Sequence, residues 1–321
     1  MNTLQRQPVK ITEALNSYAE HYDLVLVALG FEERSRAFAE TFQGQARTKF
    51  AIGFNDRHVL SYQANRKCLC SLGYEVLELG DNEFLHWWTD VLISVFEQAS
   101  PSAATRICID ISSQTRARLA LIIQGLCTIT TASNIVVDFV YSLAEFSAPS
   151  NDPEFAAICG PVTPFFAGWP ADPDMPAAAI IGLGYEAERA IGAYEYLEPT
   201  ARLVLLPQGQ DARYDRAVER ANTSMLRDLP LRERFTYRVD RPVSSFQLIE
   251  SLTYGLIPHS RVILLPFGPK LFALTCLLNA CLYYPQVGVW RVSPGVHEEA
   301  KERRASGTSI MLSALFARHQ T

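Results

Sequence analysis

The sequence is poor in the residues that most often carry metal and nucleophile chemistry. Its 321 residues include six histidines and seven cysteines, and these form no H-E-x-x-H, paired C-x-x-C or G-x-S-x-G pattern. Complete glycine-rich loops of the Walker or G-x-G-x-x-G type are missing as well. The sequence therefore predicts no metal site and no cofactor bound through a standard motif.

Positive charge and long apolar runs are also lacking. The 29 Lys and Arg against 34 Asp and Glu give a net charge of −5, so we expect no general binding of nucleic acid or membrane surfaces. No apolar run reaches the roughly 18 residues that span a bilayer, and the polar opening of residues 1–6 does not resemble a signal peptide. These absences predict a cytoplasmic protein without a membrane segment.

One pattern is present twice and organises the rest of the chain. Residues 24–37 read LVLVALGFEERSRA, and residues 179–190 read AIIGLGYEAERA. Each passes from an apolar run through Leu-Gly-aromatic-Glu into a charged helical pattern, and Gly30 and Gly184 lie 154 positions apart. We interpret each stretch as a buried strand, a glycine turn and the start of a helix.

Apolar runs of strand length alternate with helical patterns in both halves of the chain. Strands are expected at 24–29, 49–54, 75–79, 106–111 and 134–141, and again at 179–183, 202–206, 235–239, 262–265 and 288–292. Continuous apolar runs are typical of parallel strands that helices cover on both faces. The matching order, at offsets of 151 to 160, predicts two tandem Rossmann-like units, each a mostly parallel doubly wound sheet, related by internal duplication. Two unrelated α/β domains that share this rhythm are the alternative.

The domain boundaries follow from where this rhythm stops. We expect a first α/β unit at 1–145, a proline-rich connector at 146–178 and a second unit at 179–321. The stretch between Leu143 and Ala179 holds seven of the eighteen prolines, which is typical of a linker or a functional loop. At the end of the chain, the charged run 297–304 predicts a solvated helical face, and residues 310–317 predict a C-terminal helix.

Ligands of open parallel sheets bind beyond the carboxyl ends of the strands, near the point where strand order reverses. The candidates for ligand binding are the residues that follow the first and fourth strands of each unit: Gly30, Arg34, Arg36, Asp110, Ser112, Ser113, Gln114, Arg116, Gly184, Arg189, Gly268 and Lys270. Glu32 and Glu186 recur at the same place in both units and are the candidate catalytic residues.

The chemistry of these residues suits a phosphorylated ligand. Backbone N–H groups at a helix start, hydroxyls and a guanidinium hold phosphate well, and the turns 112–116 and 268–270 supply such groups. A glutamate repels phosphate, so Glu32 and Glu186 are better suited to a ribose hydroxyl or to acid–base work. Ordinary helix caps, and helix-surface pairs such as Glu32–Arg36 and Glu186–Arg189, are the structural alternatives.

Three functions remain open at this point. The leading hypothesis is that a duplicated Rossmann-like protein binds or senses a nucleotide-type or other phosphorylated ligand in a cleft between or atop its units. The first alternative is an enzyme that processes nucleosides or nucleotides, hydrolysing or transferring an N-glycosidic bond with a strand-one glutamate. The second is a protein-interaction module without a small-molecule ligand, which leaves a protein partner or a homo-oligomer open.

Overall fold

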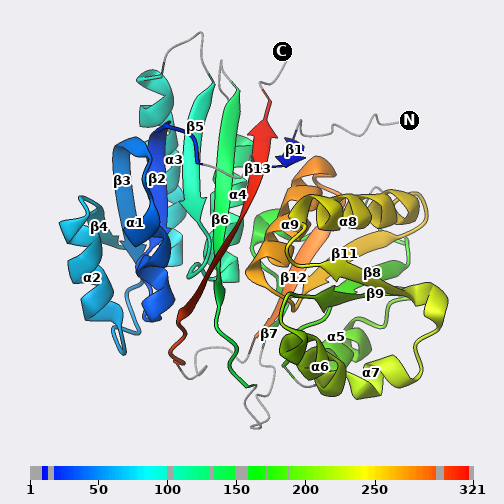
Figure 1. Ribbon diagram of the computed structural model, residues 1–321. Helices are drawn as coiled ribbons and strands as arrows, with labels where there is room; N and C mark the ends of the chain where they lie inside the picture. Colours follow the sequence, from blue (N-terminus) through cyan, green and yellow to red (C-terminus); the bar gives the residue numbers. More distant parts are fainter. Residues whose placement is uncertain are drawn as a thin grey trace. The chain divides into compact units, whose positions relative to one another are not determined.

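The computed structural model divides the chain into two α/β units, each with its own sheet and apolar core (Figure 1). It describes residues 9–13, 18–99, 104–129, 134–148, 158–170, 172–186, 188–293 and 300–317. The first unit, called the seven-stranded unit, comprises Pro8–Glu145 and Glu299–Thr321. The second, called the six-stranded unit, contains Phe146–Glu298.

The seven-stranded unit is built on a sheet of order β1-β13-β6-β5-β2-β3-β4. Five of its strands are parallel: β2 (His21–Ala28), β3 (Gln45–Gly53), β4 (Glu75–Glu78), β5 (Thr105–Asp110) and β6 (Ile135–Ala144). The other two are antiparallel to their neighbours, with β13 (Ala305–Phe316) paired to β6 and β1 (Val9–Glu13) paired to β13.

Helices cover both faces of this sheet. They are the 3₁₀ helix η1 (Glu33–Arg36), α1 (Ala37–Thr41), α2 (Tyr62–Ser71), α3 (Asp81–Glu97) and α4 (Arg116–Thr128). Val25 and Val27 of β2 pack in one core cluster with Phe38 of α1, while Leu24 and Leu26 are equally buried. Successive side chains of a strand point to opposite faces, so the second face is covered too. Figure 1 shows α3 and α4 on the face opposite α1.

The six-stranded unit has the sheet order β10-β9-β8-β11-β12-β7. Its parallel strands are β8 (Ala177–Gly182), β9 (Ala201–Gln208), β10 (Arg234–Arg238), β11 (Arg261–Pro266) and β12 (Gly288–Ser293), and β7 (Ile158–Pro161) is antiparallel to β12. Its α-helices are α5 (Arg189–Leu197), α6 (Ala212–Ala221), α7 (Thr223–Arg227), α8 (Pro242–Leu256) and α9 (Lys270–Leu282). The short 3₁₀ helices are η2 (Pro164–Phe166) and η3 (Leu231–Glu233).

The parallel strands have the same order in both sheets. The first strand of each unit lies in the centre, with the second and third on one side and the fourth and fifth on the other. The connections after the first and fourth strands therefore leave in opposite directions, and a switch point forms between β2 and β5 and between β8 and β11. The prediction of a mixed α/β fold with two mostly parallel sheets is confirmed. None of the described helices is long and apolar enough to cross a membrane.

The expected C-terminal helix at 310–317 is wrong. Residues 305–316 form β13, which pairs with β6 of the seven-stranded unit and places Leu312, Ala314 and Phe316 in the core. Pairing with a strand more than 150 residues earlier decides this element, and short-range spacing does not show it. The described part of the charged run, 300–304, is not helical either. The described part of the expected connector contributes β7 and η2 to the six-stranded unit.

Candidate functional site

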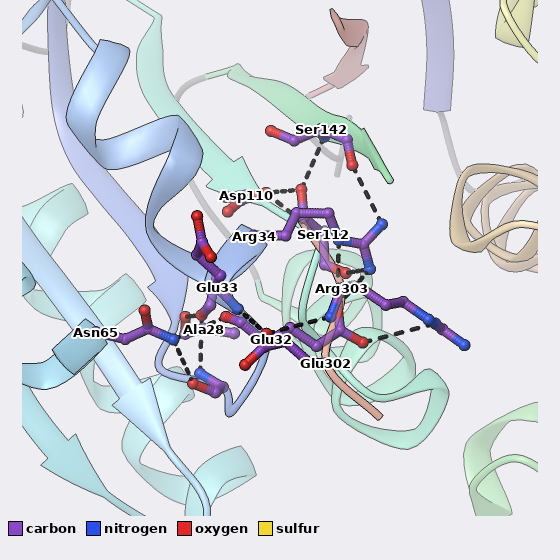
Figure 2. Close-up of polar contacts among 12 residues, drawn as sticks. Ala28, Glu32, Glu33, Arg34, Asn65, Asp110, Ser112, Ser142, Glu302 and Arg303 are labelled. Atoms are coloured by element: carbon purple, nitrogen blue, oxygen red, sulfur yellow. Dashed lines mark hydrogen bonds and ion pairs between the residues drawn. The ribbon is translucent and has the colours of Figure 1, made fainter. Parts of the chain in front are cut away.

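Polar side chains gather at the carboxyl ends of β2, β5 and β6 in the seven-stranded unit (Figure 2). Gly30 follows β2 and Ser113 follows β5, and these two turns touch. A Cβ atom on Gly30 would lie 3.0 Å from the Cβ of Ser113, closer than side chains normally pack. Glycine at position 30 therefore lets the turns meet at the switch point.

The turn after β2 is fixed by buried hydrogen bonds. The backbone N–H of Gly30 donates to Ser35 Oγ (2.8 Å), which in turn donates to the carbonyl of Ala28 (2.6 Å). Asn65 of α2 donates from Nδ2 to the carbonyls of Gly30 (2.9 Å) and Glu32 (2.8 Å). These contacts satisfy backbone N–H and carbonyl groups of the turn that a strand or helix would otherwise pair. They also hold Glu32 at the carboxyl end of the sheet.

Arg34 bridges three strand ends although its side chain is only 2% exposed. Its Nη2 donates to Glu32 (2.7 Å) and to the carbonyl of Ser112 (3.0 Å), and its Nη1 donates to the carbonyl of Ser142 (3.3 Å). Burial disfavours the charged guanidinium, but the interactions with Tyr141 and Glu32 outweigh burial and raise the pKa of Arg34. Arg34 is thus a charged cross-link between the ends of β2, β5 and β6.

Asp110 shapes the turn that leads into α4. Its side chain is buried, and Oδ1 accepts hydrogen bonds from the backbone N–H (2.9 Å) and the hydroxyl of Ser112. The same hydroxyl oxygen accepts the backbone N–H of Ser142 (2.8 Å). This carboxylate therefore orients the turn and ties the ends of β5 and β6 together.

The segment 300–304, which precedes β13 and is called the strap, lies against the turn after β2. Arg303 forms an ion pair with Glu32, with Nη1 3.6 Å from Oε1. The carboxylate of Glu302 accepts the backbone N–H of Glu33 at 2.5 Å (Figure 2). Glu32 is consequently held between two arginines and remains only 8% exposed.

The turn before α4 contains polar side chains that have no hydrogen-bond partner among the described residues. Thr115 is the N-cap and accepts the backbone N–H of Arg118 (3.0 Å). Gln114 is 1% exposed, yet within the described residues neither of its amide atoms has a hydrogen-bond partner, and neither does the Ser113 hydroxyl. Buried polar groups are normally paired, and each unpaired one costs about 1–3 kcal/mol. The amide of Gln114 and the hydroxyl of Ser113 are therefore available to hydrogen-bond with a ligand at this turn.

The outlying candidates of this unit lie on helix surfaces. Arg36 pairs with Glu40 through a 3.0 Å contact, and its Nη1 donates to Asn65 Oδ1 (3.4 Å). Arg116 is the first residue of α4 and is half-buried. Both therefore lie close to the switch point without being enclosed in it.

The six-stranded unit brings its two predicted turns together in the same way. A Cβ atom on Gly184 would lie 2.4 Å from the carbonyl oxygen of Phe267, and one on Gly268 would lie 3.0 Å from that of Leu183. Asn222 donates from Nδ2 to the carbonyl of Gly184 (2.7 Å), as Asn65 does to that of Gly30.

The remaining candidates of the six-stranded unit flank these turns. Glu186 is half-buried, whereas Arg189, the first residue of α5, is only 8% exposed. Lys270 is half-buried and is the first residue of α9. Each unit therefore has its own set of candidate residues.

Sequence reasoning missed several residues that shape the site. The charges of Glu302 and Arg303 predict a solvated face, whereas the structure pairs Glu302 with the backbone of Glu33 and Arg303 with Glu32. Arg118 is not among the predicted residues, although its side chain is fully buried. The buried asparagines had a signal, because Asn65 and Asn222 follow their glycines, Gly30 and Gly184, at similar intervals.

Among the residues that the structure describes, no group of three or more His, Cys, Asp or Glu is arranged to hold a metal ion. No known family model matches the chain, and no curated protein is significantly similar to it. The case for a function therefore rests on the geometry of the two switch points.

Proposed function

We propose that the protein binds a nucleotide-type or otherwise phosphorylated ligand at the turn between β5 and α4, and that it acts as a sensor of that ligand. The observation that carries this proposal is the buried side chain of Gln114, whose amide donors and acceptor have no partner among the described residues. Gln114 stands at a switch point, where ligands of open α/β sheets bind. A small-molecule sensor of this kind also fits the expected cytoplasmic location.

The start of α4 suits a phosphate for three reasons. The first N–H groups of a helix point toward an incoming anion, and the helix dipole favours negative charge there. Ser113 adds a hydroxyl that has no partner among the described residues. The contact between Gly30 and Ser113 lets a ligand approach both turns at once.

Glu32 suits the sugar part of such a ligand. Its carboxylate is linked through Arg34 to the Ser112 carbonyl, so it belongs to the network that shapes the α4 turn. A carboxylate accepts hydrogen bonds from ribose hydroxyls, whereas it repels phosphate. We therefore place the phosphate toward α4 and the sugar toward the turn after β2.

We also infer that the two units are Rossmann-like copies that arose by internal duplication. Their parallel strands share one order, and in each unit a buried asparagine donates to the carbonyl of the glycine that follows the first strand. Superposition of the two five-strand cores tests this inference. It predicts that Gly30 falls on Gly184 and that Asn65 falls on Asn222.

Calorimetric titration with nucleoside mono-, di- and triphosphates and cyclic nucleotides tests the binding proposal. Ser113→Asp places a carboxylate in the turn, so we expect it to weaken binding at least about tenfold through repulsion of the phosphate. Ser94→Asp makes the same change at an exposed position of α3 and should leave affinity unchanged. Absence of nucleotide binding to the unmodified protein, or equal binding by both variants, contradicts the proposal.

A further inference from the structure

Arg118, the third residue of α4, is fully buried at the place where α3 begins. Its Nε donates to Asp81 Oδ1 (2.9 Å), and its Nη2 donates to the carbonyl of Leu79 (2.7 Å). The faces of the guanidinium lie over the rings of Phe54 and Phe84, with Cζ 4.8 and 4.2 Å from their centroids. The charge is therefore enclosed by two aromatic rings and by the first residues of α3.

One edge of this guanidinium faces no acceptor among the residues that the structure describes. Within the described part of the chain, Nη1 of Arg118 is buried without a hydrogen-bond partner. An arginine side chain stays charged in a protein and carries two N–H groups on this nitrogen. A buried charge needs compensation, and Asp81 provides one carboxylate that is itself 46% exposed.

Two helix N-termini add positive potential beside Arg118, and Asp81 and Glu83 in the first turn of α3 offset part of it. The 17-residue α3 and the 13-residue α4 both begin beside its side chain, and the N-terminus of a helix carries partial positive charge. Burial lowers the pKa of Arg118, partly offset by Asp81. A cation is normally favoured at the other end of a helix, so this position favours an additional anion.

A second group, independent of the arginine, also points to a ligand at this end of α4. Gln114 precedes the N-cap Thr115, its side chain is 1% exposed, and its amide has no partner among the described residues. Arg118 lies one helical turn further along. Two buried polar side chains without full partners thus stand within five residues of one another.

We infer that Arg118, Gln114 and the first turn of α4 form a subsite for a phosphate group, and this deepens the proposed function, on which it rests. Nη1 of Arg118 and Nε2 of Gln114 donate to the phosphate oxygens. The hydrogen bond from Arg118 to the Asp81 carboxylate shows that this guanidinium binds an oxyanion. Because its side chain is nearly half exposed, it can rotate outward when a phosphate arrives.

Two substitutions with opposite expected effects test the subsite. The probes are pyrophosphate and adenosine diphosphate, titrated calorimetrically. Arg118→Lys removes the planar donor edge and should weaken binding about tenfold, the loss expected for one charged hydrogen bond. Asp81→Asn removes the negative charge that repels a phosphate beside the guanidinium and should strengthen binding severalfold. Arg66→Lys, at a partly exposed arginine of α2, is the matched control and should leave both affinities unchanged.

The opposite signs separate ligand binding from a structural role. If Arg118 only supports the fold, Asp81→Asn weakens binding or leaves it unchanged, and that result overturns the subsite even if Arg118→Lys does not fold. If nucleotide binds and neither variant changes its affinity, the subsite fails while the proposed function stands. If pyrophosphate binds in an Arg118-dependent way and no nucleotide does, the subsite stands and the nucleotide proposal fails. Absence of binding by both probes overturns the subsite, whereas the proposed function fails only when no nucleotide of the full panel binds.

Discussion

Replacing Arg34 by methionine should strongly destabilise the seven-stranded unit. Arg34 connects the ends of β2, β5 and β6, and methionine fills similar space without its charge or its donors. The substitution leaves three groups without their donor, namely the Glu32 carboxylate and the carbonyls of Ser112 and Ser142. Because the side chains of the ion pair are only 2% and 11% exposed, water replaces these contacts poorly.

The expected loss of stability depends on the charge of Glu32, which stays buried when Arg34 is replaced. Removing one partner of a buried ion pair typically costs about 3–5 kcal/mol, because an uncompensated charge stays behind. Arg303 remains 3.6 Å from Glu32, which keeps the expected loss toward the lower end, at about 3 kcal/mol. For a unit of this size, such a loss corresponds to a decrease of roughly 6–12 °C in melting temperature.

Urea unfolding followed by tryptophan fluorescence measures this loss. Trp87 and Trp88 belong to the seven-stranded unit, so a background with Trp169→Phe and Trp290→Phe makes the signal specific to it. The control is Arg36→Met, because the ion pair of Arg36 with Glu40 is partly exposed and worth about 0–1 kcal/mol. A loss below about 1 kcal/mol for Arg34→Met, or equal losses for both variants, refutes the role assigned to Arg34.

Three further predictions follow from other parts of the chain. Gly184→Ala should destabilise the six-stranded unit by about 1–3 kcal/mol, because its Cβ would meet the Phe267 carbonyl at 2.4 Å. The control is Gly192→Ala in an exposed turn of α5, which should stabilise the unit by up to about 1 kcal/mol. Thermal melts compare the two variants. Burial raises the pKa of Tyr18 from 10.0 to about 12, and it also raises the pKa values of Cys108, Tyr22, Tyr62 and Tyr74. The free energy of unfolding should therefore fall as pH rises above the ordinary cysteine pKa of 9.0 and more steeply above 10.0, which urea titrations across this range measure. Glu32→Gln should abolish any release of free base from nucleosides if the protein is an enzyme; release that survives the change removes Glu32 from the mechanism.

The parallel strands of both sheets are predictable because burial on two faces gives each of them a continuous apolar run in the sequence. The run 24–29 is apolar at every position, and each of its residues is fully buried in the structure. β13 was not predictable in this way. Its assignment depends on pairing with β6, as between Ser309 and Ser142, and local spacing carries little information about a partner so far away in the chain.

The residues of the candidate site likewise include some that nearby sequence predicts and others that depend on distant partners. Glu32, Asp110 and Ser112 were predicted because each follows a strand, and strand ends can be recognised from the apolar runs before them. Arg118 and Glu302 were missed because their importance lies in what surrounds them. A fully buried arginine and a carboxylate that caps a distant turn look like ordinary surface charges in the sequence.

The distribution of charge around the first switch point decides where a phosphate fits best. At the turn after β2, the first N–H of η1 already donates to the carboxylate of Glu302, and Glu32 lies beside it, so a second anion would be repelled there. At the start of α4 the buried guanidinium of Arg118 and two helix N-termini lie beside the half-exposed carboxylate of Asp81. Glu83 caps the N-terminus of α3, and the Asp110 carboxylate is engaged by Ser112, so Nη1 of Arg118 keeps no hydrogen-bond partner among the described residues. On the proposed function, the donors of Gln114 and Arg118 that lack partners among the described residues would orient a nucleotide with its phosphate toward α4 and its hydroxyls toward Glu32.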